Sequence, residues 1–200
     1  MITTESLIQN SLTQAFDYAG YRKHAADLLA QGMSTGHTQS EALTHYSSLN
    51  DTRMKRLDKT LVVPEEITQK LQNLEKRYEF VVISEGWCGD AAQIVPVLNK
   101  MALATDKIDL KLVLRDDNPE LMDAYLTNGA RSIPKLIVVD AETKQPITSW
   151  GPRPQEGAAI IIENKEKYGV VTDEAKTELQ LWYTKDKGLN TMNEVAALLK

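Results

Sequence analysis

The sequence predicts an α/β fold in which helices flank a central sheet, and three observations carry this prediction. From residue 79 onward, strand-like and helix-like runs alternate in the order β-α-β-α-β-β-α. The run at 79–84 is too uniformly apolar for a half-exposed strand, which favours the centre of a sheet covered on both faces. Cys88, the only cysteine in 200 residues, stands just after that run, at the first turn of the helix that follows.

Residues 1–60 are expected to form a helical leader. Apolar residues recur at helical spacing through 5–31, where Gly20 is a candidate break between two helices and Gly32 a C-terminal stop. Ser40 is expected to cap a third helix that continues to about Asp58. Because no Gly/Ser linker or low-complexity tract follows, we expect the leader to pack on the rest of the chain.

Residues 61–170 are expected to form the α/β domain. Pro64 with Glu65 and Glu66 begins a helix whose buried stripe, read from the apolar spacing, extends to Tyr78. The remaining elements follow from their periodicity: a strand at 79–84, a helix at about 91–104 that contains Pro96, a strand at 108–114, a helix from Asn118 that Gly129 ends, strands at 135–140 and 147–150, and a helix at 155–168. The last two strands are expected to pair as a hairpin.

Residues 171–200 are expected to add further helices, at 173–186 and from about Thr191. They complete a division of the chain into a leader, an α/β domain and a helical C-terminal segment.

The charge of the chain argues against binding to nucleic acid. The formal net charge is −5, and basic residues are spread among acids, so no basic stripe is present that would bind nucleic acid. The short cluster Arg53, Lys55, Arg56 and Lys59 is expected to be a solvated helix face rather than a binding patch.

The sequence also indicates the cellular compartment of the protein. With a single cysteine no intrachain disulfide can form, and nothing suggests a secreted, disulfide-stapled protein. The N-terminal residues 1–6 show no basic region followed by a long apolar run, so we expect no signal peptide. No apolar stretch is long enough to span a membrane. We therefore expect a soluble cytoplasmic protein without a membrane partner.

Cys88 is the candidate reactive residue. At a helix N-terminus, unpaired N–H groups and the helix dipole stabilise a thiolate, which lowers the pKa of the thiol. Glu85 and Asp90 add negative charge nearby and oppose this effect. We hypothesise a thiol that is less acidic than a paired catalytic cysteine. The alternative is an unreactive cysteine buried as a small apolar side chain.

The window Trp87-Cys88-Gly89-Asp90-Ala91 resembles the active site of the thioredoxin superfamily, which reads Trp-Cys-Gly-Pro-Cys. Pro96 in the following helix and the segment Arg131-Ser132-Ile133-Pro134 before a strand also match that family, where the second proline is cis and lies opposite the cysteine. Two departures occur together: Ala91 replaces the resolving cysteine, and Val82 occupies the place of a buried aspartate.

Flanking segments resemble a bacterial thioredoxin-like subgroup with a helical leader. The matching segments are Thr35-Gly36, Gln39-Ser40-Glu41, Arg53-Met54-Lys55-Arg56-Leu57-Asp58-Lys59 and Trp87-Cys88-Gly89-Asp90. The resemblance implies a thioredoxin-like fold, with Cys88 as catalytic residue. It also implies that a substrate would be bound by Trp87, Gly89, Asp90, Ile133 and Pro134.

Three interpretations of function remain open. In the first, Cys88 acts in monothiol exchange or thiol sensing, with a protein or a low-molecular-weight thiol such as glutathione as its partner. In the second, the chain is a catalytically inactive binding module that uses the groove at Trp87 and Ile133-Pro134. In the third, two chains form a dimer through a Cys88–Cys88 disulfide.

Neither a cofactor nor a metal is expected. The three histidines, His24, His37 and His45, do not have a compact ligand spacing and are better explained as surface residues. The sequence contains neither a Gly-rich phosphate loop nor a nucleophile elbow.

Overall fold

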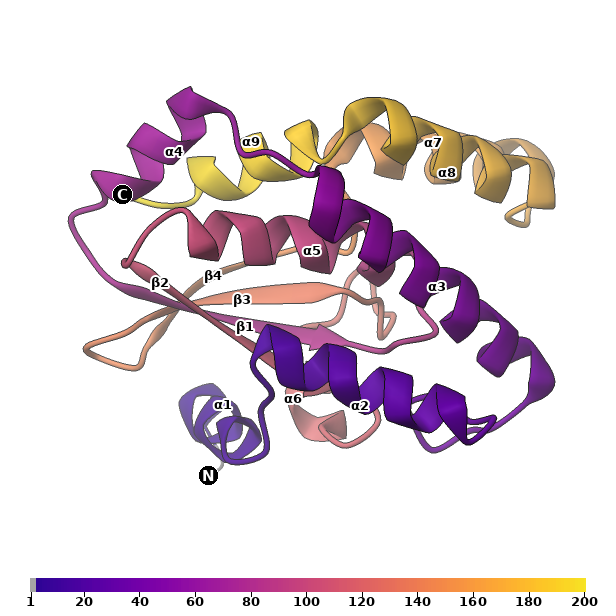
Figure 1. Cartoon of the computed structure of the whole chain (residues 1–200), viewed down its shortest axis with the longest axis horizontal. Helices are drawn as coiled ribbons and strands as arrows, with labels where there is room; N and C mark the ends of the chain where they lie inside the picture. Colours follow the sequence, from indigo (N-terminus) through magenta and orange to yellow (C-terminus); the bar gives the residue numbers. More distant parts are fainter. Residues whose placement is uncertain (1–2) are drawn as a thin grey trace.

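The computed structural model describes residues 3–200, and a four-stranded mixed sheet lies at its centre (Figure 1). The strands are β1 (Tyr78–Ser84), β2 (Ile108–Leu114), β3 (Lys135–Asp140) and β4 (Pro146–Trp150), in the order β2-β1-β3-β4 across the sheet. β2 runs parallel to β1, whereas β3 is antiparallel to both β1 and β4. This confirms the predicted α/β class with a mixed sheet, and the hairpin of the last two strands. Met1 and Ile2, which belong to the stretch tested for a signal peptide, lie outside the described residues.

Helices cover both faces of the sheet. They are α1 (Thr4–Leu12), α2 (Tyr18–Ala30), α3 (Glu41–Thr60), α4 (Glu65–Gln72), α5 (Gly89–Leu103), α6 (Pro119–Ala124), α7 (Gln155–Tyr168), α8 (Asp173–Asp186) and α9 (Leu189–Ala197). In Figure 1, α5 with α4 and α9 lies above the sheet, and α1 and α6 lie below it. No helix within residues 3–200 is both long and apolar enough to cross a membrane.

The central position of β1 in the sheet explains why the sequence of this strand is apolar without alternation. Phe80, Val81, Val82 and Ile83 are all fully buried, since β2 and β3 flank the strand and helices cover both faces. β1 ends at Ser84, and the loop that follows leads directly into α5. The position of Cys88 is therefore fixed by a central, buried strand of the sheet.

The leader helices break at a different place from the one predicted. Gly20 lies inside α2, and the chain leaves helical geometry between Leu12 and Tyr18. Phe16 there exchanges two backbone hydrogen bonds of 2.8 Å with Leu112 on the outer edge of β2. The Asp17 side chain then begins α2 by accepting a hydrogen bond from the Gly20 N–H. The break between α1 and α2 is therefore set by pairing with the sheet edge, which is a contact between residues distant in sequence.

Two further boundaries differ from the predictions. α4 ends at Gln72, and Tyr78 begins β1, where its N–H donates to the Lys107 carbonyl at 2.7 Å. α6 ends at Ala124 and does not continue to Gly129, because Thr127 and Ala130 exchange backbone hydrogen bonds across a tight turn. Asn128 and Gly129 in that turn have positive φ angles of 51° and 75°, which a helix does not allow.

The leader and the C-terminal helices both contact α5. α3 packs against α5, and α9 contacts both α4 and α5. In Figure 1, α3 and the α7–α8 pair diverge from one another as they leave α5. The division of the chain at residues 60 and 170 stays a prediction.

Candidate functional site

Cys88 is the N-cap residue of α5, and its thiol is directed at the loop before β3. The Cys88 Sγ donates a hydrogen bond of 3.4 Å to the carbonyl oxygen of Ile133. The Ile133–Pro134 peptide bond is cis, in agreement with the expectation from the family resemblance. The structure thus brings Cys88 together with Ile133 and Pro134, although 45 residues separate the cysteine from that carbonyl in the sequence.

The environment of Cys88 keeps the thiol protonated. Cys88 is buried, and this burial raises the pKa of the thiol to about 12, with the negative charge of Asp90 as the next cause. The backbone N–H groups of Ala91 and Asp90 and the charge of Arg153 act in the opposite direction but are weaker. A pKa raised in this direction leaves the thiol almost entirely neutral near pH 7. This agrees with the hypothesis of a weakly acidic thiol.

Asp90 stands where thioredoxins carry a proline, and here its carboxylate joins three parts of the chain. Its Oδ2 forms an ion pair of 2.6 Å with Arg153, and its Oδ1 accepts a hydrogen bond of 2.9 Å from the Tyr183 hydroxyl on α8. Burial and the adjacent carboxylate hold the pKa of Tyr183 well above its ordinary value, so the hydroxyl stays a donor. Asp90 therefore anchors α8 and the loop before α7 to the start of α5.

The remaining motif residues have packing roles. Trp87 is half-buried, and the Arg115 guanidinium lies 4.7 Å from the centroid of its ring. Ala91 and Val82 are buried, at 2% and 0% exposure. The position of the resolving cysteine in thioredoxins is therefore filled by the buried methyl group of Ala91.

A pocket of about 580 Å³ approaches Cys88 from the side of α3 and the α7–α8 pair. Its lining residues are Leu43, Tyr46, Arg53, Trp87, Cys88, Gly89, Asp90, Arg153, Ile161, Val171, Lys176, Leu179 and Gln180. Of the residues predicted to bind substrate, Trp87, Gly89 and Asp90 line this pocket, whereas Ile133 and Pro134 do not. This pocket is thus built largely from helices outside the central sheet.

Arg53 is a lining residue that sequence analysis placed on a solvated face. Its neighbours in the basic cluster, Lys55, Arg56 and Lys59, are indeed exposed, but Arg53 is half-buried. Helical spacing contained the signal, because Arg53 lies between Asn50 and Leu57, two buried residues of α3. A charged residue at the border of a buried helix face can be directed into a site rather than to solvent.

A second cluster supports the loop that carries Cys88. The Glu85 carboxylate accepts hydrogen bonds from the Thr35 hydroxyl and from the backbone N–H of Asp116, the latter at 3.1 Å. The Thr35 hydroxyl also accepts a hydrogen bond of 2.7 Å from the Gly86 N–H. Thr35-Gly36, noted only as a matching segment, thus holds the leader against the loop between β1 and α5.

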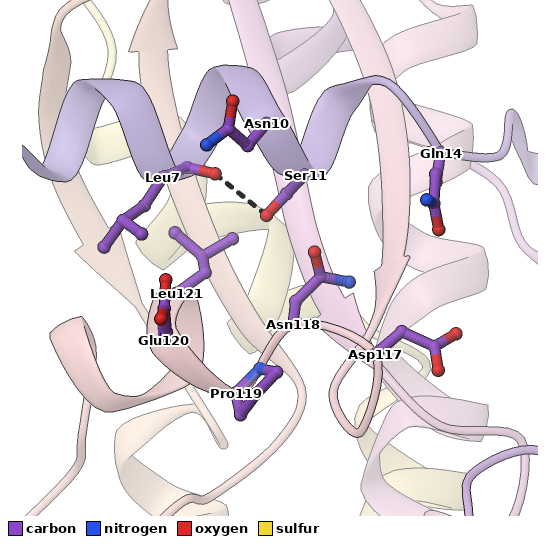
Figure 2. A pocket seen from close by; sticks show the side chains of 9 residues that line it. All are labelled: Leu7, Asn10, Ser11, Gln14, Asp117, Asn118, Pro119, Glu120 and Leu121. Carbon is purple, nitrogen blue, oxygen red and sulfur yellow. Dashed lines mark hydrogen bonds between the residues drawn. The ribbon is translucent and has the colours of Figure 1, made fainter. Parts of the chain in front are cut away.

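Another pocket, shown in Figure 2, contains none of the candidate site residues. It has a volume of about 290 Å³ and lies between α1 and the segment that begins α6. Amide and carboxylate side chains from Asn10, Gln14, Asp117, Asn118 and Glu120 surround it (Figure 2). The Ser11 hydroxyl donates to the Leu7 carbonyl of its own helix at 2.9 Å. Within residues 3–200, no group of three or more His, Cys, Asp or Glu side chains has the geometry to hold a metal ion.

Comparisons with known proteins agree with this geometry. A family model described as thioredoxin matches residues 36–178. The structure is similar to the crystal structure of a protein of unknown function from Pseudomonas aeruginosa, with a TM-score of 0.61, 18% identity, and coverage of 99% of this chain and 97% of that one. It is also similar to the crystal structure of an HIV epitope scaffold, with a TM-score of 0.59, 20% identity and 95% coverage of each chain. At these identities the likeness concerns the fold alone. A search of curated protein sequences finds no match.

Proposed function

This chain belongs to the thioredoxin family, and we propose that it is a binding protein of that family, in which the pocket beside Cys88 receives a ligand and Cys88 stays a neutral thiol. Membership of the family agrees with the expected thioredoxin-like fold. The proposal favours the second of the three interpretations drawn from the sequence, with a binding site displaced toward α3 and α8.

One observation carries the proposal: the Cys88 thiol is buried and donates a hydrogen bond to the Ile133 carbonyl, and this burial raises its pKa. Thiol exchange proceeds through the thiolate, so its rate falls with the fraction of thiolate present. A thiol whose pKa burial has raised to about 12 is poorly suited to attack a disulfide. As a donor to Ile133, the same thiol joins the start of α5 to the loop before β3.

Monothiol exchange is the second candidate, and the backbone around the sulfur favours it. The N–H groups of Asp90 and Ala91 lower the pKa of Cys88, and Cys88 lines the pocket. In this reaction the Cys88 thiolate attacks a disulfide R–S–S–R, forms the mixed disulfide Cys88–S–S–R and releases the thiolate RS⁻. Because Ala91 has no thiol, a free thiol must then attack the mixed disulfide, which restores Cys88 and leaves that thiol oxidised as its disulfide with R.

The rate of maleimide addition to the native protein distinguishes the two candidates. The matched control places a cysteine at an exposed position of α3 in a protein without Cys88, as the double variant Ser48→Cys, Cys88→Ser. For a neutral buried thiol we expect Cys88 to react at least about tenfold more slowly than the control near neutral pH. We also expect its rate to rise with pH without a plateau below about pH 10, whereas both thiols react alike in denaturant.

Intact mass spectrometry after brief hydrogen peroxide and then glutathione completes the test, with Cys88→Ser as reference. Absence of a glutathione adduct on Cys88, when the Ser48→Cys control forms one, supports the binding protein. A plateau in the maleimide rate below about pH 8 together with a rapid adduct on Cys88 alone would overturn it in favour of monothiol chemistry. A disulfide-linked dimer on a non-reducing gel would equally contradict a buried, inert thiol.

A further inference from the structure

Two side-chain donors converge above Gly89 at the start of α5. A methyl group built on Gly89 would lie 3.7 Å from Arg53 Nη1 and 3.7 Å from Gln180 Nε2. Both donors line the pocket beside Cys88, one from α3 and the other from α8. Between them is a space next to the glycine that no side chain fills.

Neighbouring amides hold both donors in place. The Asn50 side chain accepts a hydrogen bond of 2.8 Å from Arg53 Nη1 and donates one of 2.9 Å to the Gly86 carbonyl. Gln93 donates to Gln180 Oε1 at 2.9 Å, which directs the amide nitrogen of Gln180 toward Gly89. Both supporting side chains, Asn50 and Gln93, are buried. The donors are therefore preorganised rather than free surface groups.

The charges around this space leave one cation without a carboxylate. Asp90 is the single carboxylate that lines the pocket, and Arg153 and Tyr183 already bind its two oxygens. Lys176, at the rim, pairs with Asp173. Among residues 3–200, Arg53 has an amide partner but no carboxylate within salt-bridge distance. A half-buried guanidinium in this state is complementary to an anion.

The rest of the lining is apolar. Leu43 and Tyr46 from α3 stand opposite Ile161, Val171 and Leu179 from the α7–α8 region. A volume of about 580 Å³ lies within the range typical of small-molecule sites, in which apolar walls surround a few fixed polar groups.

We propose that this pocket binds an amphipathic carboxylate. Its carboxylate group accepts hydrogen bonds from Arg53 and Gln180 above Gly89, and its hydrocarbon part packs between α3 and the α7–α8 pair. The proposal names the ligand class of the binding function proposed above and rests on that function.

Isothermal titration with decanoate tests the proposal on the full chain, with decanol as the uncharged probe of the same length. We expect the wild type to bind decanoate at least about tenfold more tightly than decanol, because only the carboxylate makes charge-assisted hydrogen bonds. Shortening the chain to octanoate should weaken binding by up to about fourfold per methylene removed. Equal affinity for decanoate and decanol would overturn the anion site.

Gly89→Ala is the sharpest variant. Its methyl group makes only ordinary contacts with the two donors, and alanine is favoured in a helix, so we expect a folded protein. The same methyl group occupies the space assigned to the carboxylate, and we expect at least about a tenfold loss of decanoate affinity. Unchanged decanoate affinity in Gly89→Ala would contradict the proposed position of the anion.

Arg53→Gln and Arg56→Gln form a matched pair on α3, since Arg56 is exposed and does not line the pocket. We expect Arg53→Gln to weaken decanoate at least about tenfold and leave decanol unchanged, and Arg56→Gln to change neither. Equal losses of decanoate affinity in both variants would mean that Arg53 acts only through its long-range charge, and this would overturn the proposal. Failure here is separable from failure of the binding function, because the maleimide test of Cys88 does not involve decanoate.

Discussion

Glu85 places a fully buried carboxylate at the end of β1, three residues before the cysteine. Burial raises the pKa of this carboxylate, and the hydrogen bonds from Thr35 and the Asp116 backbone oppose the shift. The hydrogen bonds satisfy both oxygens, so the group is tolerated as part of the support for the loop before α5. Protonation of Glu85 is therefore coupled to the stability of the folded state.

The Glu85→Gln variant tests this linkage through the pH dependence of stability. Because the pKa of Glu85 is higher in the folded state, the stability that its proton contributes is present at low pH and lost as the pH rises through the folded value. We expect the free energy of unfolding of Glu85→Gln, relative to wild type, to increase as the pH rises above the ordinary pKa of a glutamate, about 4.3, measured by urea titration. The exposed residue Glu75 provides the control: Glu75→Gln should show no such trend. A difference that falls with pH would refute the linkage.

At the scale of elements, the loop between α2 and α3 closes against the segment after β2. Gly36 has a φ angle of +85°, and a methyl group there would lie 2.6 Å from Asp116 Oδ2. The same carboxylate oxygen accepts a hydrogen bond of 3.1 Å from the His37 N–H. The close approach requires glycine, both for its backbone conformation and for the absence of a side chain.

Gly36→Ala and Gly32→Ala separate these two requirements. Gly32 also has a positive φ, +73°, but nothing lies within 4 Å of a methyl group built on it. We expect Gly32→Ala to lower the free energy of unfolding by about 1 kcal/mol through backbone conformation alone. We expect Gly36→Ala to lower it by about 3 kcal/mol, because the contact with Asp116 is added. Urea unfolding measures both values. Equal costs would mean that the loop moves away from Asp116 without penalty.

At the scale of the whole molecule, polar contacts join the leader to the sheet and to the loop that carries Cys88. The Tyr21 hydroxyl on α2 is 3.0 Å from the Ser84 hydroxyl on β1, and Thr35 and Asn50 bind the loop that follows. Phe16 pairs with Leu112 at the outer edge of β2 as a one-residue bridge. These contacts cross from residues 3–60 to the centre of the sheet at several separate points.

We therefore expect the leader and the sheet to unfold in one cooperative transition. All three tryptophans, Trp87, Trp150 and Trp182, lie outside residues 1–60, so their fluorescence reports on the rest of the chain. Far-UV circular dichroism also reports on the leader helices. We expect the two signals to give coincident urea transitions. Loss of helical signal at lower urea than the fluorescence change would contradict this and would indicate a separately folding leader.

Elements whose signals are local could be predicted from sequence. Uniform apolar runs located β1 and β3, alternation located β2, and the turn after β3 helped to locate β4, all within a residue or two of the observed ends. Two of the boundaries that failed depend on partners far away in sequence, whereas the end of α6 is set by the local turn from Thr127 to Ala130. The leader breaks at Phe16 because β2 offers an unpaired edge, and Tyr78 belongs to β1 because the sheet extends to it. Periodicity within a helix carries no information about either partner.

The sequence by itself determined the α/β class, the order of the strands along the chain, and the position of one cysteine at a strand-to-helix junction with an alanine where a second thiol would stand. Only the tertiary structure decided the state of that cysteine. The pKa of Cys88 depends on burial and on the charge of Arg153 as well as on the neighbouring Asp90, and the pocket beside it combines α3, α5 and the α7–α8 pair. Solvent exclusion and electrostatic interactions act through space, so residues distant in sequence set the chemistry of this thiol.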